Sequence, residues 1–75
     1  MIRIYGKPDC PYCDRSKSFL EARGIKYQYF QIGEEIEMSD FVKMFPNARS
    51  VPQIIVDDTK IGGYTELVTF FTKTP

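Results

Sequence analysis

The sequence predicts a small α/β domain in the order β-α-β-α-β-β-α, with a four-stranded mixed sheet flanked by helices. Short apolar runs alternate with helical patterns, and glycine- or proline-containing turns separate them. The length of 75 residues allows a single domain, 1–75, near the small end of what folds alone. Hydrophobic residues make up 43% of the chain and aromatic residues 15%, which is typical of a globular protein rather than a disordered one.

The first half of the chain is expected to form a strand, a helix and a second strand. Residues 2–5 are an apolar run typical of a short buried strand, and turn-forming residues follow. A helix should begin at Pro11, whose missing N–H needs no partner at the first helical position. It should end at Arg23–Gly24, with Gly24 in a left-handed conformation. Residues 26–31 alternate as a strand does, and a helical connection predicts that the two strands are parallel, with a right-handed crossover.

The second half is expected to contain a helix, a β-hairpin and a last helix. The segment 34–45 has the pattern of an amphipathic helix, with its large apolar residues roughly on one side. A buried strand at 53–57 is followed by a tight turn and a short antiparallel strand at 60–61. The glycine pair 62–63 ends that strand, and residues 65–72 should form the final helix.

Charge and hydropathy exclude several classes of partner. Ten basic and ten acidic residues cancel, so nothing favours binding to nucleic acid or to an anionic membrane. The N-terminal residues lack the apolar run of a signal peptide, and no segment approaches the roughly 20 apolar residues of a membrane span. We therefore expect a cytoplasmic protein that acts as a monomer.

Cys10 and Cys13, the only cysteines, are separated by two residues at the start of the first predicted helix. Two thiols at this spacing can close a disulfide and open it again. As a structural staple the bridge would close too short a loop to constrain the unfolded chain much. A zinc site would need further ligands, and the chain has no histidine, so no metal is expected. Two inert core thiols remain the other interpretation.

The two thiols are expected to differ. Cys10 should lie at the surface, where the N-terminus of the helix favours its thiolate and holds its pKa below the ordinary value. Backbone N–H groups of Tyr12 and Cys13 could stabilise that thiolate, and so could the ammonium group of Lys7, although Lys7 could equally be a solvated surface lysine. Burial should raise the pKa of Cys13, which would then react second, as the resolving thiol. The ring of Tyr12 is either incidental or packs against substrate.

Three segments resemble those of dithiol glutaredoxins of the CPYC type, in order and spacing: Lys7–Cys13, Arg49–Gln53 and Ile61–Gly63. The resemblance covers essentially the whole chain and is to the compact bacterial and viral forms, so a viral chain would act in the host cytoplasm. It implies a thioredoxin fold, a cis peptide bond before Pro52, and glutathione as reductant and cosubstrate.

The resemblance also implies the functional residues. It makes Cys10 and Cys13 catalytic. It implies glutathione contacts from ten further residues: Lys7, Tyr12, Arg49, Ser50, Val51, Pro52, Gly63, Tyr64, Thr65 and Glu66. Lys7 and Arg49 would serve the glycine end of glutathione, and residues 63–66 its γ-glutamyl end. Without the family, Pro52 could simply begin a strand and the glycines could simply end one.

The chain departs from the family pattern at Ser50 and at residues 64–66. Ser50 replaces the commoner threonine and keeps a hydroxyl group. Residues 64–66 replace a small residue followed by a serine or aspartate and an aspartate. The larger Tyr64 could therefore reshape the γ-glutamyl end of the site.

These observations predict a glutathione-dependent thiol–disulfide oxidoreductase that reduces protein disulfides and glutathione mixed disulfides. Ribonucleotide reductase is a family-level candidate for the electron acceptor. A redoxin reduced by thioredoxin reductase is one alternative, but such proteins usually carry a tryptophan-containing segment near the last helix and this chain has no tryptophan. A [2Fe–2S] carrier is another, but carriers usually have a small residue where Pro11 stands. A redox-inert interaction module is the third.

Overall fold

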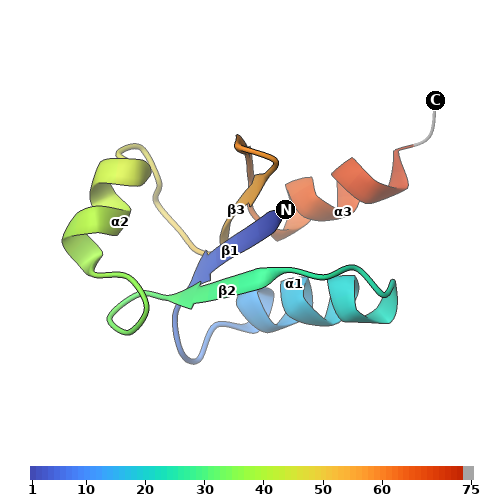
Figure 1. Ribbon diagram of the computed structural model, residues 1–75, viewed down its shortest axis with the longest axis horizontal. Coiled ribbons are helices and arrows are strands. Elements are labelled where there is room, and N and C mark those ends of the chain that lie inside the picture. The colour runs from blue at the N-terminus through green and yellow to red at the C-terminus, as the bar shows by residue number, and fades with distance from the viewer. Residues whose placement is uncertain (74–75) are drawn as a thin grey trace.

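A four-stranded mixed sheet in the order β2-β1-β3-β4 forms the centre of the molecule (Figure 1). The computed structural model describes residues 1–73. β1 pairs in parallel with β2 and antiparallel with β3, and β3 pairs antiparallel with β4. The predicted element order and mixed sheet are confirmed. The elements are β1 (Ile2–Gly6), α1 (Pro11–Ala22), β2 (Gln28–Gln31), α2 (Met38–Met44), β3 (Gln53–Val56), β4 (Thr59–Gly62) and α3 (Tyr64–Thr72).

The helices divide between the two faces of the sheet. Alternate residues of a strand point to opposite faces, so Ile4 and Tyr5 belong to different cores. Figure 1 shows α1 and α3 close together and α2 well apart from them. The core under α1 and α3 consists of Ile2, Ile4, Leu20, Ile54, Val56 and Leu67. The core under α2 consists of Tyr5, Phe41, Phe45 and Ile55.

Helix α1 begins and ends as the sequence predicts. Cys10 is its N-cap and Pro11 its first residue. At its end Gly24 has a φ of +68°, a conformation that costs glycine little. The N–H groups of Gly24 and Ile25 bond to the carbonyls of Glu21 and Leu20, which is the hydrogen-bond pattern of a Schellman-type helix end. The position of the cysteine pair at the N-terminus of α1 is therefore fixed locally.

Several predicted boundaries differ from those of the structure, and the largest differences lie at the starts of α2 and β2. The expected helix 34–45 begins only at Met38, because the segment before it turns back on β2. There the N–H of Gln31 bonds to the carboxylate of Glu35, and the N–H of Gly33 bonds to the carbonyl of Ile36. Strand β2 begins at Gln28 rather than at 26, and α3 begins one residue earlier than expected.

The β3–β4 hairpin turns on Asp57 and Asp58, which have φ values of +48° and +70°. Two consecutive positive φ values match the twist that two-residue hairpins require. A carboxylate oxygen of Asp58 lies 3.0 Å from the guanidinium of Arg3, which ties the turn to β1.

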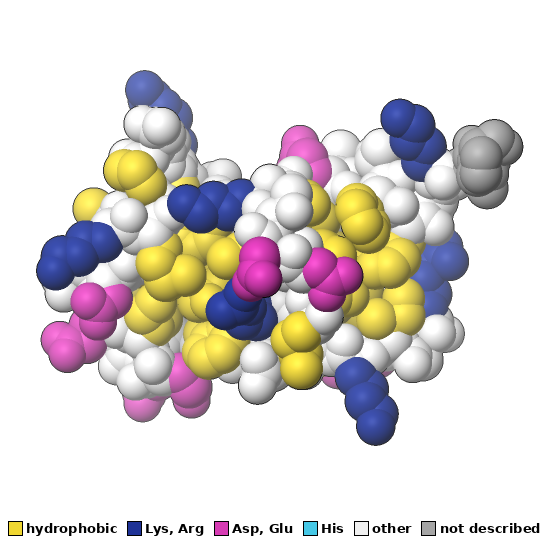
Figure 2. Space-filling model, turned by 45° about the horizontal axis from the view of Figure 1, so that its top comes forward, with side chains coloured by type: hydrophobic (Ala, Val, Ile, Leu, Met, Phe, Trp, Pro, Cys, Tyr) yellow, Lys and Arg dark blue, Asp and Glu magenta, His cyan; other side chains and the backbone are white. Residues whose placement is uncertain are grey.

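Apolar side chains also remain on the surface. Figure 2 shows them in two areas, one over α2 and one over α3, with charged side chains between them. Met38 and Val42 of α2 and Phe70 of α3 are at least half exposed. Within residues 1–73, the helices are all too short or too polar to pass through a lipid bilayer.

Candidate active site

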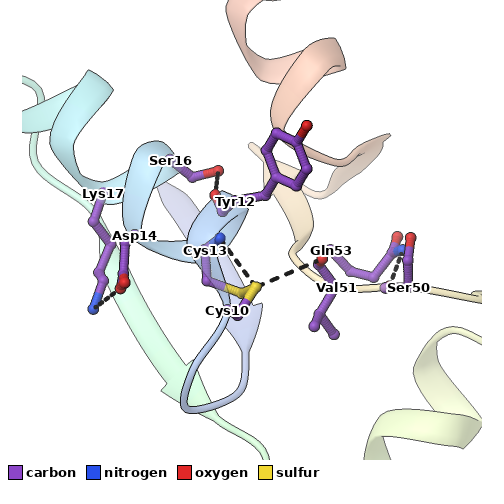
Figure 3. The surroundings of a disulfide bond; sticks show 9 residues. All are labelled: Cys10, Tyr12, Cys13, Asp14, Ser16, Lys17, Ser50, Val51 and Gln53. Carbon is purple, nitrogen blue, oxygen red and sulfur yellow. Dashed lines mark hydrogen bonds and ion pairs between the residues drawn. A yellow bond between two sulfur atoms is a disulfide. The ribbon is translucent and has the colours of Figure 1, made fainter.

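A disulfide between Cys10 and Cys13 lies at the N-terminus of α1, with 5.2 Å between the two Cα atoms (Figure 3). The N–H of Cys13 donates a hydrogen bond to Cys10 Sγ at 3.1 Å. Of the two N–H groups expected to reach this sulfur, that of Cys13 does so. One turn further, the hydroxyl of Ser16 bonds to the carbonyl of Tyr12 at 2.8 Å and fixes the first turn from inside. The pair can therefore open and close on a rigid helix end.

The expectation that Cys10 lies at the surface is wrong, because only 6% of it is exposed. The segment before β3 covers it, and Cys10 Sγ lies 3.8 Å from the carbonyl oxygen of Val51 (Figure 3). In the disulfide form, Cys10 Sγ carries no proton and only contacts the Val51 carbonyl oxygen. In the reduced protein, the Cys10 thiol can donate a hydrogen bond to this oxygen. Cys13 is fully buried, as expected. An incoming thiolate therefore reaches Cys10 through a small opening and cannot reach Cys13.

The segment that covers Cys10 is held in one conformation. The Val51–Pro52 peptide bond is cis, as the resemblance implied, and Pro52 is buried. The side-chain amide of Gln53 donates to the carbonyl of Ser50 at 2.7 Å. This arrangement places the backbone of Val51 directly beside the redox pair.

Two cavities share Ser50 and Val51. The first, of about 310 Å³, has a basic rim and an apolar floor, and it is lined by Lys7, Ile32, Met38, Phe41, Ala48, Arg49, Ser50 and Val51. The second, of about 280 Å³, is lined by Tyr12, Ser50, Val51, Pro52, Gly63, Tyr64, Thr65 and Glu66. Each lies at or near the lower end of the range of small-molecule sites. The structure thus brings all ten expected binding residues together around Ser50 and Val51, the segment that lies beside the redox pair.

The first cavity contains residues that the sequence interpretation did not assign to the site. Its floor comes from Met38 and Phe41 of α2, together with Ile32 and Ala48. The sequence did contain a signal for these residues, namely the apolar side of the helix predicted at 34–45. That pattern indicated residues of the core rather than the wall of a cavity. A larger cavity of about 550 Å³ lies between the end of α2 and β4, but its lining includes neither Ser50 nor Val51, the segment that lies beside the redox pair.

The second cavity is bounded by aromatic rings and by the start of α3. The rings of Tyr12 and Tyr64 lie 5.7 Å apart, centroid to centroid, at 30°, and the guanidinium of Arg15 lies 5.2 Å from the ring of Tyr12. The side chain of Glu66 accepts a hydrogen bond from the N–H of Gly63 at 2.8 Å. One carboxylate oxygen of Glu66 is therefore already engaged in capping α3.

The charged residues near the pair are mostly exposed. Lys7 is exposed and lines the first cavity.

Among the side chains of residues 1–73, no three of the types His, Cys, Asp and Glu gather as they would around a metal ion.

The comparisons with known proteins agree with this geometry. A sequence model described as Glutaredoxin matches residues 2–61. Glutaredoxin 3 of Escherichia coli K12 is 36% identical over 67 residues, which are 88% of this chain and 80% of that protein. Glutaredoxin 1 from Francisella tularensis, solved with cacodylate, has a TM-score of 0.77 at 29% identity and covers 96% of this chain and 92% of its own. Reduced Escherichia coli glutaredoxin has a TM-score of 0.77 at 34% identity, with coverages of 97% and 94%.

Proposed function

The chain belongs to the glutaredoxin family and is a thiol–disulfide oxidoreductase of the thioredoxin fold, and we propose that glutathione is the reductant that it uses. Glutaredoxins as a family use glutathione in this way. The observation that carries the proposal is the position of the Cys10–Cys13 pair beside the segment shared by two cavities, which together contain every expected binding residue.

The charges around the two cavities suit the tripeptide. Glutathione carries a carboxylate at each end and one ammonium group. The glycine carboxylate would meet Lys7 and Arg49 at the rim of the first cavity. The γ-glutamyl carboxylate would meet the N-terminus of α3 in the second, where free N–H groups favour an anion. The middle of the peptide would pair with the backbone of Val51 as an added strand does.

The reaction follows from which sulfur can be reached. A glutathione thiolate attacks Cys10, the more exposed sulfur, and forms a mixed disulfide while Cys13 leaves with the electron pair. A second glutathione thiolate attacks the glutathione sulfur of that mixed disulfide, which releases glutathione disulfide and the Cys10 thiolate. Two glutathiones thus supply the two electrons. In the forward direction Cys10 attacks a protein disulfide or a glutathione mixed disulfide, and Cys13 resolves the protein adduct.

A second candidate function is that of a redoxin driven by thioredoxin reductase, which shares the fold and the cysteine pair. The two cavities favour glutathione because a redoxin served by a reductase needs no tripeptide site. The physiological acceptor, with ribonucleotide reductase as one candidate, is part of the proposal.

A coupled assay tests the proposal. Wild-type protein should turn over a mixed disulfide of glutathione and a small thiol when supplied with glutathione and glutathione reductase. Cys10→Ser should reduce this activity to background, because the attacking sulfur is lost. Cys13→Ser should retain it, because only protein-disulfide reduction needs the second thiol. Turnover that appeared only with thioredoxin reductase would overturn the choice of reductant, and loss of activity in Cys13→Ser would overturn the division of roles.

A further inference from the structure

Gly6, at the end of β1, marks a point where side chains from two other elements converge. A Cβ atom built on Gly6 would lie 2.7 Å from Cys13 Sγ, and closer still to the hydroxyl oxygen of Tyr29. Both distances are shorter than non-bonded atoms allow, so only glycine leaves room for both groups. The phenol hydroxyl and the buried sulfur are therefore neighbours above the backbone of Gly6.

The secondary structure explains this convergence. In the β1–β2 register Tyr29 lies opposite Ile4, and Ile4 belongs to the core under α1 and α3, so Tyr29 extends beneath α1. The ammonium group of Lys17, one turn after Cys13, lies 4.3 Å from the centroid of the Tyr29 ring. Lys17 also pairs with Asp14 at 3.7 Å, and Figure 3 shows this pair on the side of α1 next to β2. The ring is thus held under the first turns of α1.

Cys13 needs a hydrogen-bond donor when the disulfide opens. Attack on Cys10 leaves the electron pair on Cys13 Sγ, and Cys13 is fully buried, so water cannot solvate the resulting thiolate. A buried anion without a donor is strongly disfavoured. Cys10, by contrast, accepts the N–H of Cys13 at the helix N-terminus.

We propose that the Tyr29 hydroxyl is this donor, and that Tyr29 is a positioning residue for Cys13 in the dithiol half of the reaction. When a thiolate attacks Cys10, a new sulfur–sulfur bond forms at Cys10, the Cys10–Cys13 bond breaks, and the Cys13 thiolate accepts a hydrogen bond from the phenol. In the reverse direction the same bond holds Cys13 ionised for its attack on an adduct at Cys10. The role rests on the proposed function, because it concerns the opening and closing of the same disulfide.

The surroundings keep the phenol protonated and able to donate. Burial, followed by the charges of Asp14 and Glu35, raises the pKa of Tyr29 above its ordinary value. Lys17 places a cation over the same ring. Asp14, Lys17 and Glu35 are therefore the charged groups that bear on the pair.

Tyr29→Phe tests the proposal, because it removes the hydroxyl and keeps the ring. Tyr27→Phe is the matched control, since the hydroxyl of Tyr27 bonds to Glu21 instead. In a Cys10→Ser background, where Cys13 is the only thiol, thiolate absorbance against pH should give a higher pKa for Cys13 in Tyr29→Phe than with Tyr29 intact. In the two-cysteine protein, reduction of the disulfide by excess dithiothreitol should slow about tenfold, the size expected for loss of a charge-assisted hydrogen bond.

The monothiol reaction separates this role from a merely structural one. In a Cys13→Ser background, Tyr29→Phe should leave deglutathionylation by Cys10 unchanged. The proposal is overturned if Tyr29→Phe and Tyr27→Phe give the same Cys13 titration and the same rate of disulfide reduction. This assay uses dithiothreitol instead of glutathione, so it tests the role of Tyr29 independently of the proposed reductant. If the wild-type protein did not turn over with glutathione but Tyr29→Phe still slowed reduction by dithiothreitol, glutathione would be refuted as the reductant and the role of Tyr29 would be supported.

Discussion

The two faces of the sheet are packed differently. The face under α1 and α3 is closed by six buried aliphatic side chains, and Cys13 and Ser16 of α1 are fully buried beside them. The face under α2 is built mainly from aromatic rings, with Tyr5 stacked on Phe30 at 5.0 Å. Helix α2 has only seven residues, of which Phe41 is the buried one, and a cavity of about 310 Å³ remains beside it.

The two faces therefore have different roles: one supports the helix that carries the cysteines, and the other offers a surface for ligand binding. The closed face fixes the helix that carries the cysteines, so the sulfur atoms are held in place. The open face leaves apolar surface uncovered next to Lys7 and Arg49, where a ligand can lie. Substitutions on the closed face should therefore affect mainly stability, and those at the rim of the open face should affect mainly substrate binding.

Two neighbouring isoleucines of β3 give the largest expected effect and compare the faces directly. Ile54 points into the closed core and Ile55 into the core under α2. Ile54→Ala should lower the free energy of unfolding by about 3–5 kcal/mol, since it loses transfer energy and leaves a sealed void. Ile55→Ala should lose about 2 kcal/mol, close to the transfer term alone, because its surroundings are less tightly closed. Urea unfolding of both variants measures the difference.

A loss for Ile55→Ala equal to or larger than that for Ile54→Ala would contradict the comparison. Because a domain of this size is only marginally stable, Ile54→Ala could unfold. The milder pair Ile54→Val and Ile55→Val should then show the same order, at roughly 0.5–1.5 kcal/mol.

Arg49→Ala tests the role of the open face in substrate binding, and its expected effect is smaller. The guanidinium lies at the rim of the first cavity, so its loss should raise KM for a glutathione mixed disulfide about three- to fivefold, the size of one exposed ion pair. Its unfolding free energy should stay within about 0.5 kcal/mol of wild type. Steady-state kinetics at varied substrate concentration give KM and kcat separately.

Lys43→Ala is the control for Arg49→Ala, because it removes an exposed cation from the last turn of α2 that lines neither cavity. An equal rise in KM for the two variants would mean that only the overall charge of this face matters. An unchanged KM in Arg49→Ala would show that the basic rim of the first cavity does not contribute to substrate binding.

The smallest expected effect concerns the edge of the closed face. Burial, and then a hydrogen bond to Glu21, raise the pKa of Tyr27 to about 12. The folded state therefore keeps this proton while the unfolded state releases it from about pH 10. The contribution of Tyr27 to stability is complete below pH 10 and is lost as the pH rises towards 12. Because Glu21 is exposed, we expect a loss of less than about 1 kcal/mol.

Tyr27→Phe cannot ionise and should lack this part of the alkaline decline. Urea unfolding of both proteins at pH 9 and pH 11 measures it, and the difference between them cancels the titration of the lysines. A parallel decline in the two proteins would show that the Tyr27 hydroxyl is ionised equally in both states.

Local signals made most of the fold predictable from the sequence. Pro11 and Gly24 mark the ends of α1 by backbone preferences alone, and the apolar run from Ile54 to Val56 marks β3. The cysteine spacing indicates redox chemistry without any knowledge of the fold. The start of α2 was not predictable in this way, because Glu35 uses its carboxylate to bind the backbone of Gln31 instead of beginning a helix.

The details of the site depend on contacts between distant parts of the chain. Cys10 is buried by Val51, 41 residues later, and no local pattern around Cys10 indicates that cover. The approach of Tyr29 to Cys13 depends equally on the β1–β2 register and on the absence of a side chain at Gly6. The family resemblance supplied the expected binding residues, which spacing alone could not.

The central place of β1 in the sheet has a consequence for how the protein is made. β1 precedes the other described strands along the chain, yet one of its two partners, β3, spans Gln53–Val56. A growing chain that has not reached Val56 can form only the β1–β2 pair, and Ile2 and Ile4 then lack half of their core. Because non-local pairing must wait for its partner, we expect the Val51 segment that covers Cys10 to take its place only after β3 has been made.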